Sequence, residues 1–349
     1  INMILDPILI FGFDMGIAGA AIATAVSQCI SFSILLYQTA TKEGCIRLKL
    51  SKFSPKFNIL GPILHAGVPS LCRQGLASVA TMLLNVAANP FGDAAIAAMS
   101  IVSRYMMFIN SALIGFGQGF QPVCGYNYGA KKYDRVHDIV HTALLMTFIL
   151  AVVFTGLGIA MVPFMLNFMK TPAEVMPEAT TYLTIYFAGV IGLMIYNIGS
   201  GILRAIGDSQ RPFYFLVVSA VLNTILDLVF VIAFDMGVAG VALATVVSQG
   251  VSAILVLILL LRTDLCIRFI PCDLKMHWDM LSKIIRVGIP AAIQMAITSF
   301  SNIFVQSYIN YFGADCMSGW TAYAKIDQLM FMPMQSVALA STTFVGQNL

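Results

Sequence analysis

Long apolar stretches separated by short polar segments recur along all 349 residues of the chain. All but the first are longer than the roughly 20 residues that a helix needs to cross the hydrocarbon core of a bilayer. Backbone groups in lipid must be paired within their own segment, and the short alternating strands of a membrane barrel are not seen. The pattern therefore predicts about ten transmembrane helices, at 1–13, 17–40, 60–90, 94–125, 135–168, 174–204, 212–234, 238–261, 283–312 and 316–346.

The composition supports membrane embedding over a water-soluble fold. Hydrophobic residues make up 59% of the chain and charged residues 10%, and the mean hydropathy is +0.88. Soluble domains carry about 25% charged residues, so this chain lacks the charges to cover a water-exposed surface. The net charge is only +3, and its basic residues lie in short loops, which argues against nucleic acid as a partner.

The distribution of basic residues predicts the orientation of the helices. Of the 19 Lys and Arg residues, 15 fall in loops on one side of the predicted bundle, whereas the opposite loops carry mainly acids. Basic loops of multi-pass proteins lie in the cytoplasm. We therefore expect a multi-pass protein of the plasma (inner) membrane with four cytoplasmic loops, at 41–59, 126–136, 204–211 and 262–286.

An internal repeat with an offset of 221 residues is the strongest sequence signal. Residues 2–31 read NMILDPILIFGFDMGIAGAAIATAVSQCIS and residues 223–252 read NTILDLVFVIAFDMGVAGVALATVVSQGVS, with 17 of 30 positions identical. One period holds six predicted helices, so successive copies share one orientation, as in transporters whose substrate path lies between parallel repeats. The fold expected is an all-α polytopic membrane helical bundle in which six-helix lobes are repeated in parallel.

Each repeated hairpin carries a set of oxygen-bearing side chains at membrane depth. Asn2 and Asp6 are four residues apart and share one helix face, and Thr24 lies about as far after the turn as Asp6 lies before it. A carboxylate, an amide and a hydroxyl are hard ligands that suit a proton or a small cation. The second copy repeats the set as Asn223, Asp227 and Thr245. The alternative for both copies is a structural hydrogen-bond cluster between helices.

Four further ionisable side chains are predicted within the membrane: Arg73, Arg104, Lys325 and Asp327. Arg104 and Lys325 are repeat partners. Such residues usually face the bundle interior or a water-filled cavity, so all four are candidates for lining a substrate cavity. Pairing across helices and snorkelling to the interface are the alternatives.

Sequence signals for catalysis are absent. The seven cysteines form no CxxC pair and no Cys/His zinc spacing, and no P-loop, dinucleotide fingerprint, zincin motif or nucleophile elbow occurs. We therefore expect neither an enzyme nor a bound metal or cofactor, apart from a coupling proton or sodium ion.

Several segments resemble the multidrug and toxic compound extrusion (MATE) transporters. Residues 204–249, RAIGDSQRPFYFLVVSAVLNTILDLVFVIAFDMGVAGVALATVVSQ, are similar to the fifth and sixth helices of a lobe in that family, as is the first copy of the repeat. The segments GFGQGFQPVCGYNYGAKKYDRV and STTFVGQN resemble the end of a second helix. The resemblance implies two six-helix lobes, alternating access, and export of organic, often cationic or amphipathic, compounds against an inward proton or sodium flux.

The same resemblance implies ion-coupling roles for the hairpin residues. The family's first-lobe site uses an Asn and an Asp four apart on the fifth helix and a Thr on the sixth, which Asn2, Asp6 and Thr24, and also Asn223, Asp227 and Thr245, match. The family also draws on an acid in the first helix of the lobe, but residues 66–90 and 287–312 contain no Asp or Glu.

The order of the segments is not the order expected for two consecutive lobes. The chain reads as the last hairpin of one lobe (1–45), a complete lobe (60–262) and the first two helices of another (281–349). A piece of a tandem protein, or two relatives joined near residues 130–140, would give this order. An inactive fragment and a lipid or glycan-precursor flippase are the alternatives to an exporter, and a complete chain is expected to be a monomer.

Overall fold

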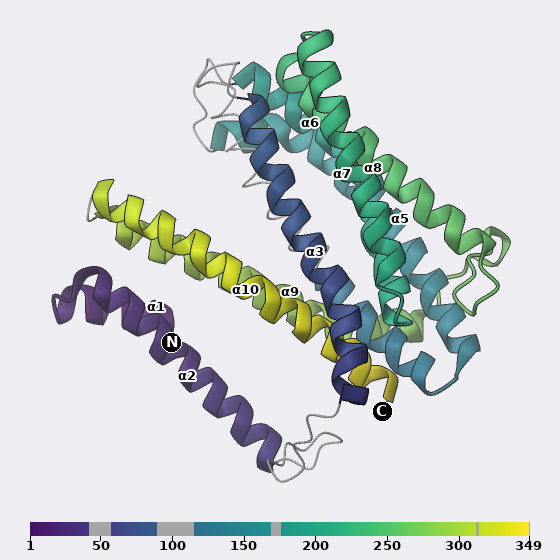
Figure 1. The fold of residues 1–349 in the computed structure, drawn as a ribbon, viewed down its shortest axis with the longest axis horizontal. Coiled ribbons are helices and arrows are strands. Elements are labelled where there is room, and N and C mark those ends of the chain that lie inside the picture. The colour runs from purple at the N-terminus through teal and green to yellow at the C-terminus, as the bar shows by residue number, and fades with distance from the viewer. Residues whose placement is uncertain (42–56, 89–114, 169–175, 312–313, 349) are drawn as a thin grey trace. The chain divides into compact units, whose positions relative to one another are not determined.

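The described part of the chain is entirely helical in its regular structure. The structure is a computed structural model that describes residues 1–41, 57–88, 115–168, 176–311 and 314–348. Its α-helices are α1 (Asn2–Pro7), α2 (Gly16–Thr41), α3 (Phe57–Ala88), α5 (Tyr133–Phe168), α6 (Met176–Ala205), α7 (Gln210–Leu228), α8 (Gly237–Arg262), α9 (Trp278–Tyr311) and α10 (Ala314–Asn348) (Figure 1). Residues 115–129 are also helical, and no strand occurs within these ranges.

These helices confirm the all-α membrane fold that the apolar stretches predict. Among the described residues, seven helices are long and apolar enough to span a bilayer, including Met176–Ala205 and Gly237–Arg262. The predicted stretch 94–125 is helical from residue 115 onward, and its first part lies outside the described residues. The chain is therefore a multi-pass membrane protein.

The chain forms two compact units. One comprises Ile1–Gly61 with Ile293–Met334, and the other comprises Pro62–Ala292 with Gln335–Leu349. Helices α3, α9 and α10 contribute residues to both units. The division does not follow the three expected lobe segments 1–45, 60–262 and 281–349, which stay a prediction.

Helix α6 organises the larger unit. It packs against α5 and α8, and α7 packs against α8 (Figure 1). A Cβ added to Gly199 of α6 would overlap Val256, and one added to Gly189 would overlap Val246. Small residues at these positions let the backbones of α6 and α8 approach closely, which is how membrane helices gain packing contacts without a hydrophobic driving force.

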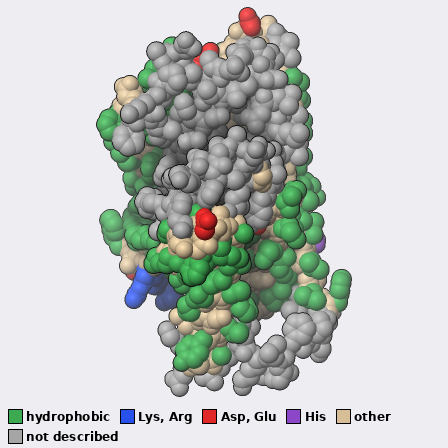
Figure 2. All heavy atoms as spheres, turned by 90° about the vertical axis from the view of Figure 1, so that its left-hand side faces the viewer, with side chains coloured by type: hydrophobic (Ala, Val, Ile, Leu, Met, Phe, Trp, Pro, Cys, Tyr) green, Lys and Arg blue, Asp and Glu red, His purple; other side chains and the backbone are tan. Residues whose placement is uncertain are grey.

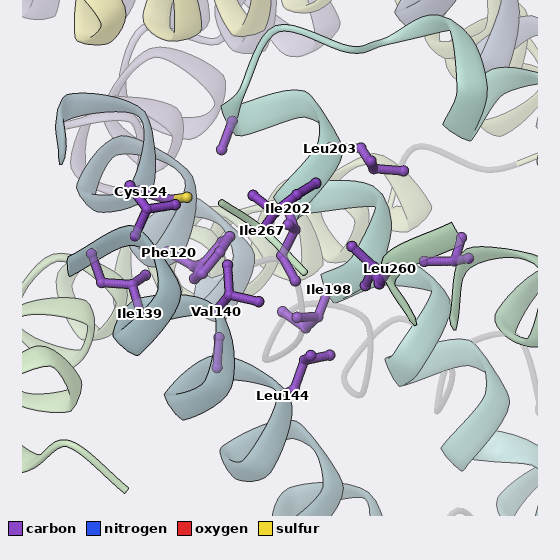
Figure 3. Close-up of a cluster of buried hydrophobic side chains, with 14 of the residues drawn as sticks. Phe120, Cys124, Ile139, Val140, Leu144, Ile198, Ile202, Leu203, Leu260 and Ile267 are labelled. Atoms are coloured by element: carbon purple, nitrogen blue, oxygen red, sulfur yellow. The ribbon is translucent and has the colours of Figure 1, made fainter. Parts of the chain in front are cut away.

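A cluster of apolar side chains fixes one end of this unit. Phe120 from the 115–129 helix, Ile139 and Val140 from α5, Ile202 from α6 and Leu260 from α8 are fully enclosed and point toward one another (Figure 3). Ile267 reaches the same cluster from the loop after α8. Side chains from five segments thus hold the helix ends of this unit together.

The outward surface is apolar, as contact with lipid requires. On the face drawn in Figure 2, the coloured side chains are mostly hydrophobic and few charged groups are visible. Along α5, large apolar side chains such as Phe148, Leu157 and Phe164 are exposed. Water would not stabilise such a surface, whereas hydrocarbon would.

Removing the ring of Phe120 should destabilise the larger unit. The side chain is fully buried, so Phe120→Ala leaves a cavity that its neighbours fill only partly, at a cost of about 3 kcal/mol. Phe148→Ala is the matched control because its ring is 54% exposed and faces outward. Denaturant unfolding in detergent, followed by circular dichroism, should show a lower midpoint for Phe120→Ala alone. Equal midpoints for the two variants would contradict this core assignment.

Candidate ion-coupling site

The two copies of the repeat fold into the same helical hairpin. In each, an α-helix continues into a π-helical turn, Ile8–Gly12 after α1 and Val229–Ala233 after α7. The chain then reverses through left-handed residues, Asp14 (φ 54°) and Asp235 (φ 51°). Hydrogen bonds at equivalent positions close the turns, from Met15 N to Leu9 O (3.2 Å) and from Met236 N to Phe230 O (3.0 Å).

The sequence of the turn explains its geometry. Asp is one of the few residues with a side chain that tolerates a left-handed conformation, and Gly16 and Gly237 adopt it without strain, at φ 54° and 55°. A Cβ on Gly19 would lie 2.8 Å from the backbone carbonyl of Leu9. Glycine there brings the second helix of the hairpin directly against the segment that follows Asp6.

The first hairpin brings Asn2 and Thr24 together. Asn2 Nδ2 donates to Thr24 Oγ1 (3.2 Å), and Thr24 Oγ1 donates to the carbonyl of Ala20 (3.0 Å). From α9, Ser301 Oγ donates to Asn2 Oδ1 (3.4 Å). The amide thus bridges three helices within the smaller unit.

Asp6 lies on the same hairpin, and its carboxylate accepts no hydrogen bond from the described residues. Its exposed fraction is 0%, and neither carboxylate oxygen has a hydrogen-bond partner among the residues that the structure describes. Asp6 follows Asn2 by one helical turn, so both side chains lie on one face of the α1 segment. The structure therefore buries a carboxyl group that no donor from the described residues satisfies.

The second hairpin repeats the burial with different neighbours. Asp227 is 6% exposed, and within the described ranges its Oδ1 atom has no hydrogen-bond partner. Asn223 Nδ2 is also buried and unpartnered there, while Thr245 Oγ1 donates to Val241 O (3.0 Å). The phenol of Tyr182 on α6 lies beside Thr245 and close to Asp227. The Asn–Thr hydrogen bond of the first copy is thus not formed in the second.

These environments limit what the carboxyl groups can do. An ionised carboxylate without donors is costly in an apolar interior, so the group needs a proton or a cation. Carboxylate, amide and hydroxyl oxygens are suitable ligands for a small hard cation. No group of three or more His, Cys, Asp or Glu side chains that could hold a metal ion occurs in the described part of the chain.

The structure places the other predicted site residues in different environments or leaves them outside its described part. Arg73 lines a small pocket together with Arg204, and Asp327 is exposed on α10. Arg104 lies outside the described residues, and so does the side chain of Lys325. Two neighbours were missed by sequence reasoning, Ser301 and Tyr182, because each reaches its hairpin from a helix far away in the sequence and carries no motif.

Arg204 is the residue shared by the predicted helix 174–204 and the expected cytoplasmic loop 204–211. The structure places it in the last turn of α6, with its Nε atom buried. Helix α6 continues to Ala205 and α7 begins at Gln210, so the loop between them is shorter than the expected 204–211.

Comparisons with known proteins place the chain in a family. The family model described as MatE matches residues 69–229 and 290–349. The probable multidrug resistance proteins YpnP and YoeA of Bacillus subtilis (strain 168) are 29% identical over 261 residues and 30% identical over 290 residues. The matches cover 75% and 81% of this chain, but only 58% and 63% of those relatives.

A solved structure has the same fold. An outward-facing multidrug resistance MATE family transporter of the MOP superfamily matches with a TM-score of 0.78 at 23% identity, over 85% of this chain and 67% of the other. This likeness concerns the fold alone, whereas the family model covers more than half of the residues. The chain belongs to the MatE (MATE) family of membrane transporters.

Proposed function

We propose that this chain acts in secondary active efflux of organic, often cationic or amphipathic, drug-like compounds, driven by inward proton or sodium movement. The names of its relatives, which are multidrug resistance proteins, support the substrate class. The observation that supports ion coupling is the pair of buried carboxyl groups, Asp6 and Asp227, placed by equivalent hairpins. Neither oxygen of Asp6, nor Oδ1 of Asp227, has a hydrogen-bond partner among the described residues.

In this proposal the ion acts by binding one transport state better than the other. A proton or sodium ion at Asp6, with Asn2 and Thr24 as neighbours, removes an uncompensated charge from an apolar interior. It can shift the equilibrium between inward- and outward-facing states only by its difference in affinity for them. Asp227, Asn223 and Thr245 form the equivalent site of the second hairpin.

The proposal also includes the lobe boundaries, the membrane orientation and the substrate-cavity residues predicted from the sequence. Residues 60–262 form one lobe, with a hairpin of a neighbouring lobe at 1–45 and the start of another at 281–349. The basic loops face the cytoplasm across the cell membrane. Arg73, Arg104, Lys325 and Asp327 remain candidates for the wall of the substrate cavity. No specific observation favours the flippase alternative.

Neutralising the buried acids should abolish coupled transport. In proteoliposomes that contain the full chain, Asp227→Asn and Asp6→Asn should lower gradient-driven transport of a fluorescent organic cation at least about tenfold, because the ion loses its charged ligand. Asp235→Asn and Asp14→Asn are matched controls, since these acids are exposed, lie at the turn of the same hairpins, and Asn tolerates their left-handed backbone. Both controls should transport as the unaltered chain does.

Separate proton and sodium gradients in this assay identify the coupling ion. Wild-type rates in both buried-acid variants would contradict the proposed role of the hairpins. Headgroup-specific lipid scrambling that does not depend on either gradient would favour the flippase instead.

The orientation can be tested by labelling single cysteines. In a chain with all native cysteines replaced, a cysteine at Asp235 should react with a membrane-impermeant maleimide added outside intact cells, because it lies in a loop expected on the outer side. A cysteine at Asp264, in the basic loop after α8, should react only after permeabilisation. The reverse labelling pattern would show that the orientation is wrong.

A further inference from the structure

A small pocket in the larger unit lies away from both hairpin acids along the chain. It encloses about 180 Å³ of space, part of which is open to solvent. It is lined by Pro69, Ser70 and Arg73 of α3, Arg204 at the end of α6, and Ser209, Pro212 and Phe213 at the start of α7. A drug-sized site usually has about 300–1,000 Å³, so this pocket is too small for a whole substrate.

Two arginines line this pocket, and no Asp or Glu lines it within the described part of the chain. The Nε atoms of Arg73 and Arg204 are both buried, and neither has a hydrogen-bond partner among the described residues. The two guanidinium groups are close enough to repel each other. Two adjacent buried cations are unfavourable, and an anion between them would remove both the repulsion and the unsatisfied donors.

The acid nearest along the chain does not compensate these charges. Asp208 precedes the pocket residue Ser209, but its Oδ2 atom pairs with Arg211 Nε (3.3 Å). Its Oδ1 atom accepts a hydrogen bond from Arg211 N (3.2 Å). Both oxygens are thus engaged by an exposed arginine, and no Asp or Glu lines the pocket among the described residues.

The position of the pocket along the helices indicates where a ligand would come from. Arg204 lies in the last turn of the span Met176–Ala205, and Ser209 immediately precedes the span Gln210–Val231. Helix ends of this kind lie near the headgroup layer of the bilayer. Guanidinium groups bind phosphate oxygens through paired, charge-assisted hydrogen bonds. The Ser209 hydroxyl can add a donor, whereas Ser70 Oγ already donates to Ala66 O (3.4 Å).

We propose that Arg73 and Arg204 form a binding site for a phosphate group, supplied either by an anionic phospholipid headgroup or by inorganic phosphate. The site uses the start of α7, whereas Asp227 lies near the other end of the same helix, and it needs neither transport nor a coupling ion to bind its ligand.

Thermal unfolding of the full chain in an uncharged detergent tests this site. The probes are a short-chain phosphatidylglycerol, inorganic phosphate, and diacylglycerol with the same acyl chains but no phosphate. Phosphatidylglycerol should raise the unfolding temperature saturably, and diacylglycerol should not. Arg73→Gln and Arg204→Gln should each raise the half-saturating concentration about tenfold or more, because each removes a charged donor.

The matched control is Arg262→Gln, which removes an exposed arginine at the end of α8 and should leave the half-saturating concentration unchanged. If a glutamine variant does not fold, the lysine variant keeps the charge but loses the paired geometry, and its half-saturating concentration should rise at least about threefold. Saturable binding of phosphate as well as lipid would make the free anion a sufficient ligand, whereas binding of the lipid alone would identify the headgroup. The proposal would be overturned if neither phosphatidylglycerol nor inorganic phosphate stabilised the wild-type chain, or if wild type and both arginine variants bound equally.

Discussion

An ionised carboxylate surrounded by hydrocarbon is costly, and both helical hairpins of this chain place one there. Asp6 and Asp227 are buried in equivalent positions, and in the described part of the chain neither oxygen of Asp6, nor Oδ1 of Asp227, has a hydrogen-bond partner. The surrounding features serve that placement, since the π-helical turn and the left-handed aspartate reverse the chain and Gly19 lets the second helix approach. A proton or a cation at such a carboxylate would compensate the charge.

The sequence predicts the helices well because the bilayer restricts the possibilities. A span must be apolar, long enough and internally hydrogen-bonded, so hydropathy alone located α2, α5 and α8 to within about two residues of their observed ends. The identical residues of the repeat likewise predicted that the two turns would match, and their left-handed positions do. In both cases the relevant physics is local to the segment.

Contacts between distant segments could not be predicted in the same way. Ser301 bonds to Asn2 and Tyr182 lies beside Thr245 because of how whole helices pack, and hydropathy carries no information on helix rotation. The burial of Arg204 also depends on how the helices pack. From the sequence alone, a charge at a predicted span boundary could equally belong to a loop. The Asn–Asp–Thr spacing therefore gave the candidates, while the packing of the helices determined what surrounds them.

Infrared difference spectroscopy of the carboxyl groups tests the central claim most directly. The full chain in lipid would be compared before and after a change in pH, and before and after addition of sodium. We predict a change in a protonated carboxyl band or a carboxylate band that is reduced in Asp6→Asn and in Asp227→Asn and is absent when both are replaced. An identical difference spectrum in the double variant would show that neither acid binds the ion, and would contradict the mechanism.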